Sequence, residues 1–116
     1  LLDNTTADSN IAIGYRALLV NTTGAGNTAV GSYVLDANTT GANNVAIGLN
    51  SMTTNTTASE NTAVGKNALS ANTTASNNTA TGYDALRDYT TGTANSDACR
   101  MLSMWSKVGD SFFFMA

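Results

Sequence analysis

The chain repeats itself with a fixed period of seventeen residues. The tripeptide Asn-Thr-Thr begins at residues 4, 21, 38, 55 and 72, and a glycine stands ten residues after each start, at 14, 31, 48, 65 and 82. A unit this short cannot bury a core of its own, so it becomes stable only by stacking on its copies. The period therefore predicts a solenoid with one coil per repeat.

The repetition covers most of the chain. Five copies align without a gap, and a sixth begins at Tyr89 and loses the pattern at Asp97 and Cys99, where the other copies carry Ala and Gly. We expect one domain with two parts. Residues 1–95 form five and a half solenoid repeats, and residues 96–116 form an aperiodic, apolar segment that caps the solenoid or contacts another subunit.

Each repeat contains the segment Asn-x-Ala-x-Gly, which has the alternation of a β-strand. The residues on either side of the alanine are mostly β-branched, and a period of two indicates a strand rather than a helix. Successive repeats should pair in parallel, which gives an all-β, parallel β-solenoid. We expect one column of these β-branched residues in the core: Ile13, Val30, Ile47 and Val64.

The opposite face of the predicted strand carries alanine in every copy. A strand open to water on one side usually alternates apolar residues with charged or long polar ones, so repeated alanine implies a closely packed neighbour. That neighbour is either the opposite wall of a flat coil or another chain. The candidate oligomer face comprises Ala12, Ala29, Ala46, Ala63 and Ala80.

The strand ends at a glycine, and a second apolar column follows it. Glycine adopts positive φ and lets another backbone approach closely, as expected for the strand-end residues Gly14, Gly31, Gly48, Gly65 and Gly82. The segment after each glycine is a short strand or a single helical turn. It supplies a stacked core column of Leu18, Leu35, Met52, Leu69 and Leu86.

The rest of the repeat, Asn-Thr-Thr-(Ala/Gly)-x-x-Asn, is typical of a turn. Stacked coils lie about 4.8 Å apart, so side-chain amides at equivalent positions can bond along the solenoid. We predict a ladder of Asn10, Asn27, Asn44, Asn61 and Asn78. Asn-Thr-Thr also matches the acceptor for N-glycosylation, but a turn repeated for folding would generate every copy.

Composition excludes several functions. A net charge of −3 and five scattered basic residues leave no patch for nucleic acid or anionic membranes. The absence of His and the single Cys99 exclude a disulfide framework, a Cys/His zinc site and a His-dependent triad. The apolar C-terminal segment is shorter than the roughly 20 residues that span a bilayer. We expect no cofactor, no metal and no membrane insertion.

The segments Asn-Ile-Ala-Ile-Gly, Asn-Thr-Ala-Val-Gly and Asn-Val-Ala-Ile-Gly resemble the head repeats of trimeric autotransporter adhesins and the related repeats of phage tail-fibre and surface-fibre proteins. The resemblance covers residues 4–95 and implies a left-handed β-roll assembled as a homotrimer. It also implies an extracellular, cell-surface or virion location, with a host receptor or glycan as partner. A core of about two aliphatic side chains per coil independently favours oligomers.

A structural segment of a fibre or adhesin is therefore the favoured function, as a rigid rod or head of a phage tail fibre or cell-surface trimer. One alternative is an extracellular filament whose coils stack end to end. Another is an ice-binding solenoid, although Thr28, Thr62 and Thr79 share their column with Ile11 and Val45.

An enzyme is the remaining function class. Glycoside hydrolysis needs a pair of carboxylates. The carboxylates of Asp36, Asp84 and Asp88 fit solvated turn residues better, so we expect no catalytic activity.

Overall fold

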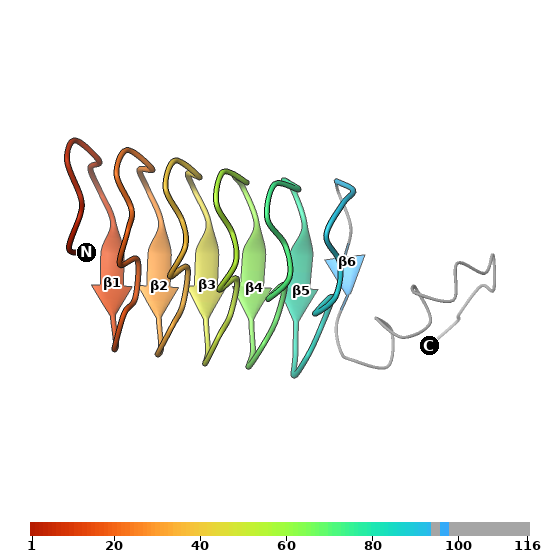
Figure 1. Cartoon of the computed structure of the whole chain (residues 1–116). Coiled ribbons are helices and arrows are strands. Elements are labelled where there is room, and N and C mark those ends of the chain that lie inside the picture. Colours follow the sequence, from red (N-terminus) through yellow and green to blue (C-terminus); the bar gives the residue numbers. More distant parts are fainter. Residues whose placement is uncertain (94–95, 98–116) are drawn as a thin grey trace, which may run out of the picture.

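The structure is a computed structural model that describes residues 1–93 and 96–97. One short strand recurs in each coil, and the strands lie side by side in chain order in a single sheet (Figure 1). The described strands are β1 (Ile11–Ile13), β2 (Thr28–Val30), β3 (Val45–Ile47), β4 (Thr62–Val64), β5 (Thr79–Thr81) and β6 (Ser96–Asp97).

All neighbouring strands pair in parallel, and the register equals the sequence period. Ile11 lies opposite Thr28 and Ala12 opposite Ala29, and the same step of one period recurs from β1 to β5. The prediction of a parallel β-solenoid with one coil per repeat is confirmed. The pairing of Thr79 with Ser96 keeps this step, so the parallel sheet continues past the predicted boundary at residue 95.

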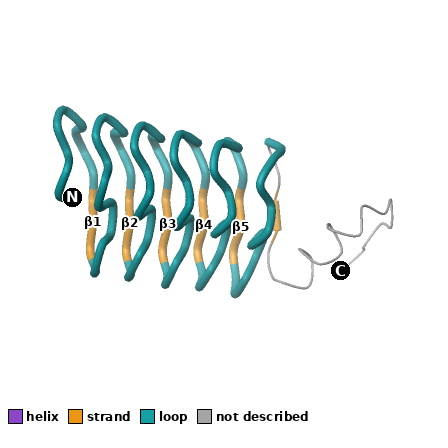
Figure 2. Tube along the Cα trace, viewed as in Figure 1, coloured by secondary structure: helices purple, strands orange, loops and turns teal. Residues whose placement is uncertain are grey.

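Between the described strands the chain consists of turns, with neither a second strand nor a helix (Figure 2). The segment that carries the leucine column is therefore not the short strand or helical turn that the sequence suggested. Left-handed residues explain this, since Asn50 and Met52 have φ of 59° and 51°, and equivalent residues of the other coils match them. Such residues interrupt any run of extended or right-handed helical backbone.

The strand-end positions require glycine because their φ is positive and because the next coil leaves no room for a Cβ. Gly48 has a φ of 120°, and a Cβ built on it would lie 2.7 Å from the carbonyl carbon of Gly65 in the next coil. Successive coils thus touch backbone to backbone at this corner, which only glycine permits.

The interior is one side chain deep, with the alanines of the strands on one side and the leucine column on the other. Leu18, Leu35, Met52 and Leu69 are fully buried and Leu86 is 2% exposed. Of the two neighbours considered for the alanines, the structure shows the opposite wall of their own coil, so the prediction that they form an oligomer face is wrong. Ala29, Ala46, Ala63 and Ala80 are fully buried, and Ala12, at the end of the stack, is half-buried against the same cluster.

The assignment of the β-branched column to the core is also wrong. Strand alternation places these residues opposite the buried alanines, so they point outward. Ile13 is 60% exposed and Ile47 38% exposed, while Val30 and Val64 are half-buried by their neighbours in the sheet.

Asparagine amides fill the part of the interior that the aliphatic residues leave. Asn44 Nδ2 donates to Asn27 Oδ1 at 3.0 Å, and the backbone N–H of Asn61 donates to Asn44 Oδ1 at 3.0 Å. The same pattern joins the ladder from Asn10 to Asn78.

A second ladder links the asparagines of the Asn-Thr-Thr corners. Asn38 Nδ2, for example, donates to Asn21 Oδ1 at 2.8 Å. The side chains of Asn21, Asn38, Asn55 and Asn72 are fully buried. The folded coil therefore withholds these four acceptor asparagines from glycosylation.

Candidate interaction face

The sheet presents one regular face to solvent, which we call the outer sheet face. It consists of the side chains that flank the alanines on β1–β5, and none of them is charged. They are Ile11, Ile13, Thr28, Val30, Val45, Ile47, Thr62, Val64, Thr79 and Thr81. Sequence reasoning missed this face because it assigned half of it to the core. The alanine in every copy could have revealed this face. A small side chain at that position indicates the interior of a coil that is one side chain deep, so the residues on either side of it must point outward.

The outer sheet face is exposed on β1, on β5 and at Ile47. Ile11 is 52% exposed and Ile13 is 60% exposed, while the valines between neighbouring strands are half-buried. Contiguous apolar surface of this kind typically marks a contact with another molecule.

A neighbouring column of larger side chains extends this apolar surface. Tyr15, Leu49 and Tyr83, which follow the strand-end glycines, are 66%, 41% and 54% exposed. The rings of Tyr15 and Tyr33 meet edge to face, with centroids 5.4 Å apart. Aromatic and aliphatic residues thus border the outer sheet face on one side.

The outer sheet face carries no charge, and the described charges lie beside it, with Lys66 in the same column as Leu49 and Tyr83. Arg16 Nη2 pairs with Asp36 Oδ2 at 3.1 Å, and its guanidinium lies 5.7 Å from the ring centroid of Tyr33. The hydrogen bond to Asp36 raises the pKa of Arg16 above its ordinary value. Lys66 Nζ lies 5.9 Å from the ring centroid of Tyr83. The outer sheet face itself stays neutral at any working pH.

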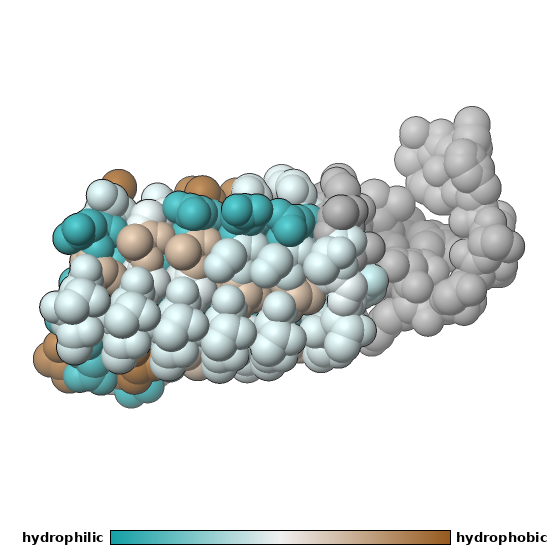
Figure 3. Space-filling view, turned by 90° about the horizontal axis from the view of Figure 1, so that it is seen from above, coloured by the Kyte–Doolittle hydropathy of each residue, from teal (hydrophilic) through white to brown (hydrophobic). Residues whose placement is uncertain are grey.

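Seen from above, over the coil corners, the molecule is mostly of intermediate hydropathy (Figure 3). The second threonine of each Asn-Thr-Thr is exposed. In the first four copies the hydroxyl of the first threonine bonds to the next coil, as from Thr22 to the carbonyl of Thr39 at 3.0 Å. The corner is therefore neutral and hydroxyl-rich, and it differs from the apolar outer sheet face.

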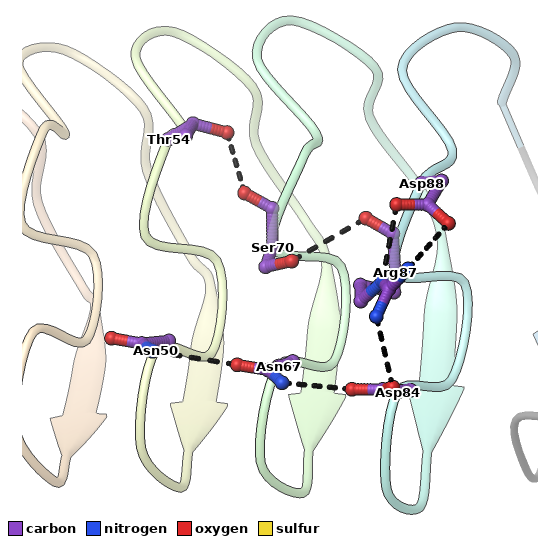
Figure 4. A network of polar contacts seen from close by, with 7 residues as sticks. All are labelled: Asn50, Thr54, Asn67, Ser70, Asp84, Arg87 and Asp88. Carbon is purple, nitrogen blue, oxygen red and sulfur yellow. Dashed lines mark hydrogen bonds and ion pairs between the residues drawn. The ribbon is translucent and has the colours of Figure 1, made fainter.

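Asp84 is the buried member of a polar network (Figure 4). Asn67 Nδ2 donates to Asp84 Oδ1 at 2.8 Å, and Arg87 Nη1 pairs with Asp84 Oδ2 at 3.1 Å. Arg87 Nε also contacts Asp88 Oδ1 at 3.1 Å. The interpretation of Asp84 as a solvated turn residue is wrong, since it is only 1% exposed. It continues a column of side chains in which Asn50 and Asn67 precede it.

Other kinds of site receive no support from the described residues. They contain no group of three or more His, Cys, Asp or Glu side chains that could hold a metal ion. They also contain no helix long and apolar enough to cross a membrane. Cys99 and the proposed cap or subunit contact after β6 lie outside the described residues.

Comparison of the chain with protein-family models, curated proteins and solved structures gave no match. Support for a function therefore comes from the stacked coil and its outer sheet face.

Proposed function

We propose that this chain is a rigid structural segment of a surface fibre, acting as the rod or head of a phage tail fibre or cell-surface trimer. It assembles as a homotrimer through the outer sheet face. The observation that supports this proposal is the exposure of Ile11, Ile13 and Ile47 on one uncharged face of a coil with a very thin core.

The thin core is the reason to expect assembly. Each inner coil buries its strand alanine, one leucine or methionine and a few small side chains beside them, together with two asparagines. Burial of apolar surface stabilises by about 25 cal/mol per Å². Three copies that turn their outer sheet faces toward a common axis would remove Ile13, Ile47 and their neighbours from water. The left-handed β-roll suggested by the resemblance to adhesin heads is part of the same proposal.

The stacked coils suit a rod that keeps its length. The strands pair in one register from β1 to β6, and two asparagine ladders run along the interior. Bending such a stack would break many of these bonds at once. An extracellular or virion location, and a receptor or glycan partner at the fibre surface, remain proposals drawn from the resemblance.

Light scattering on the full chain tests the trimer. We expect a particle of three times 11.9 kDa for the wild type, and dissociation when Ile47→Lys places a charge in the centre of the outer sheet face. Thr57→Lys, an exposed residue at a coil corner, is the matched control and should stay trimeric. A wild-type monomer, or an Ile47→Lys variant that stays trimeric, would refute assembly through this face. Electron micrographs that show long filaments instead would favour end-to-end stacking.

Ice binding is a second candidate for the same face. Thr28, Thr62, Thr79 and Thr81 point outward among Ile and Val on strands about 4.8 Å apart. Their β-branched side chains have few rotamers, so the array is rigid. This function requires the face to be open to solvent. A monomer that shows thermal hysteresis, lost in Thr62→Lys, would support ice binding, whereas a trimer without hysteresis would exclude it.

A further inference from the structure

The coil that begins at Tyr89 is joined to its neighbour differently from every earlier coil. In the earlier pairs, three bonds close the Asn-Thr-Thr corner. Asn72 Nδ2 donates to Asn55 Oδ1 at 3.1 Å, while the N–H and hydroxyl of Thr56 donate to the carbonyl of Thr73 at 3.0 and 3.1 Å. The coils that begin at Asn21, Asn38 and Asn55 are closed onto the preceding coil by the same three contacts.

These three bonds are all missing at the next pair. Asn72 Oδ1, to which an asparagine at position 89 would donate, is buried without a hydrogen-bond partner in the described structure. Within that same part, neither the N–H nor the hydroxyl of Thr73 bonds to the carbonyl of Thr90. Thr73 is accordingly exposed, whereas Thr39 and Thr56 are half-buried. The corner is therefore open between these two coils.

The remainder of the sixth coil keeps its attachment. β6 pairs with β5 in the ordinary register, with Thr79 opposite Ser96 (Figure 1). Asn78 Nδ2 also donates to the carbonyl of Gly92 at 3.2 Å. The coil is thus held at Tyr89, at Gly92 and at the strand, while the described residues lack the corner bonds from Thr73 to Thr90.

Tyr89 explains the position of the opening. In the preceding coils the corner asparagine donates both to the asparagine before it and to a carbonyl three residues later, as Asn72 does to Ala75 at 3.0 Å. A tyrosine ring has no amide hydrogens and cannot occupy this place. It packs partly buried against the core instead. The corner asparagine ladder ends at Asn72 because the next coil has a tyrosine where an asparagine would continue the ladder.

We propose that residues 89–91 are a strap that stays open over the corner of the coil of residues 72–88, which makes a loose joint between these two coils. Tyr89 keeps the strap open by leaving Asn72 Oδ1 without its donor. The joint loosens the corner of the last described coil while β5 and β6 stay paired. This inference rests on the coil geometry and holds for a monomer or a trimer, so it stands or falls independently of the proposed assembly.

Residue-resolved hydrogen exchange on the full chain tests the joint. We expect the amide hydrogens of Thr73 and Thr74 to exchange at least about tenfold faster than those of Thr56 and Thr57, which are hydrogen-bonded. In Tyr89→Asn, the restored amide should close the corner and slow exchange at Thr73 by about tenfold. Tyr89→Phe, which adds no amide donor, should leave Thr73 as fast as in the wild type.

Equal protection of Thr73 and Thr56 in the wild type would overturn the proposal. So would a folded Tyr89→Asn variant in which Thr73 still exchanges rapidly. Exchange at Thr39 and Thr56 reports whether the rest of the solenoid is intact in each variant. Loss of the tyrosine ring could lower the protection of amide hydrogens throughout the Tyr89→Asn variant. In that case the comparison of Thr73 with Thr56 in the wild type still tests the proposal.

Discussion

Individual residues in this coil adopt backbone angles that most L-amino acids avoid. Leu35 has a φ of 50°, Tyr33 of 59° and Glu60 of 61°. A left-handed conformation costs roughly 1–2 kcal/mol for residues other than Gly, Asn or Asp. One coil alone could not hold several such residues in place. Their angles persist because the coils on either side fix the backbone.

One of these positions offers a direct test of the strain. Gly26, Asn43 and Asn77 occupy the place that Glu60 has in its own coil, and all have positive φ. We expect Glu60→Asn to raise the free energy of unfolding by about 0.5–1 kcal/mol, because asparagine tolerates the left-handed region better. Urea denaturation measures this. Glu60→Gln, which removes the charge but keeps the strain, is the control. If Glu60→Gln raised the free energy of unfolding by as much, the stabilisation would come from removal of the charge and not from relief of backbone strain.

At the scale of the strand, the sequence allowed the element to be predicted but not its orientation. The period located each strand, its parallel partner, its terminal glycine and the leucine column. A period of two cannot say which face is buried when neither face is charged, and hydrophobicity alone favoured Ile13 and Ile47 over the alanines. Side-chain volume decides instead. Only alanine fits opposite a leucine in a coil this thin, so the larger β-branched residues remain outside.

The turns were less predictable for a related reason. Leucine and tyrosine are poor candidates for left-handed backbone, so no local rule would place Leu35 or Tyr33 there. Stacking against equivalent residues imposes these angles. Asp84 was misjudged in the same way, because its partners Asn67 and Arg87 meet it only once the coils are stacked.

The orientation of the strand predicts opposite results for two neighbouring residues. Ala46→Leu should lower the free energy of unfolding by about 1–3 kcal/mol, since it overpacks a fully buried position. Ile47→Leu, a change of similar chemistry on the outer sheet face, should alter it by less than about 1 kcal/mol. Chemical denaturation under conditions that favour the monomer compares the two. If Ala46→Leu left the free energy of unfolding unchanged, the strand alanines would have to be exposed, and the strand orientation in the structure would be wrong.

For the whole molecule, the important property is that every coil is equivalent to the next. Stability in such a stack is approximately a sum over coils and the contacts between neighbours. Removing a whole period should therefore shorten the solenoid without disturbing its register, whereas removing one residue fewer should shift the strand by one position and place alanines where outward-facing residues belong.

Deletion of residues 45–61 tests this equivalence, because it removes one whole period of the repeat. We expect a cooperatively folded protein with lower stability and one strand fewer. Deletion of residues 45–60 leaves the chain one residue out of register and should abolish cooperative unfolding. Circular dichroism during urea titration follows both. Similar behaviour of the two deletions would show that the period does not control the fold.

The corner asparagine ladder also gives the rod a direction. From Asn21 to Asn72, each amide nitrogen points toward the preceding coil and each amide oxygen toward the following one. The amide dipoles of this ladder therefore add along the axis, so the stack differs in its two directions. An assembly that continued this ladder from one stack into the next would therefore be polar, with every chain pointing the same way.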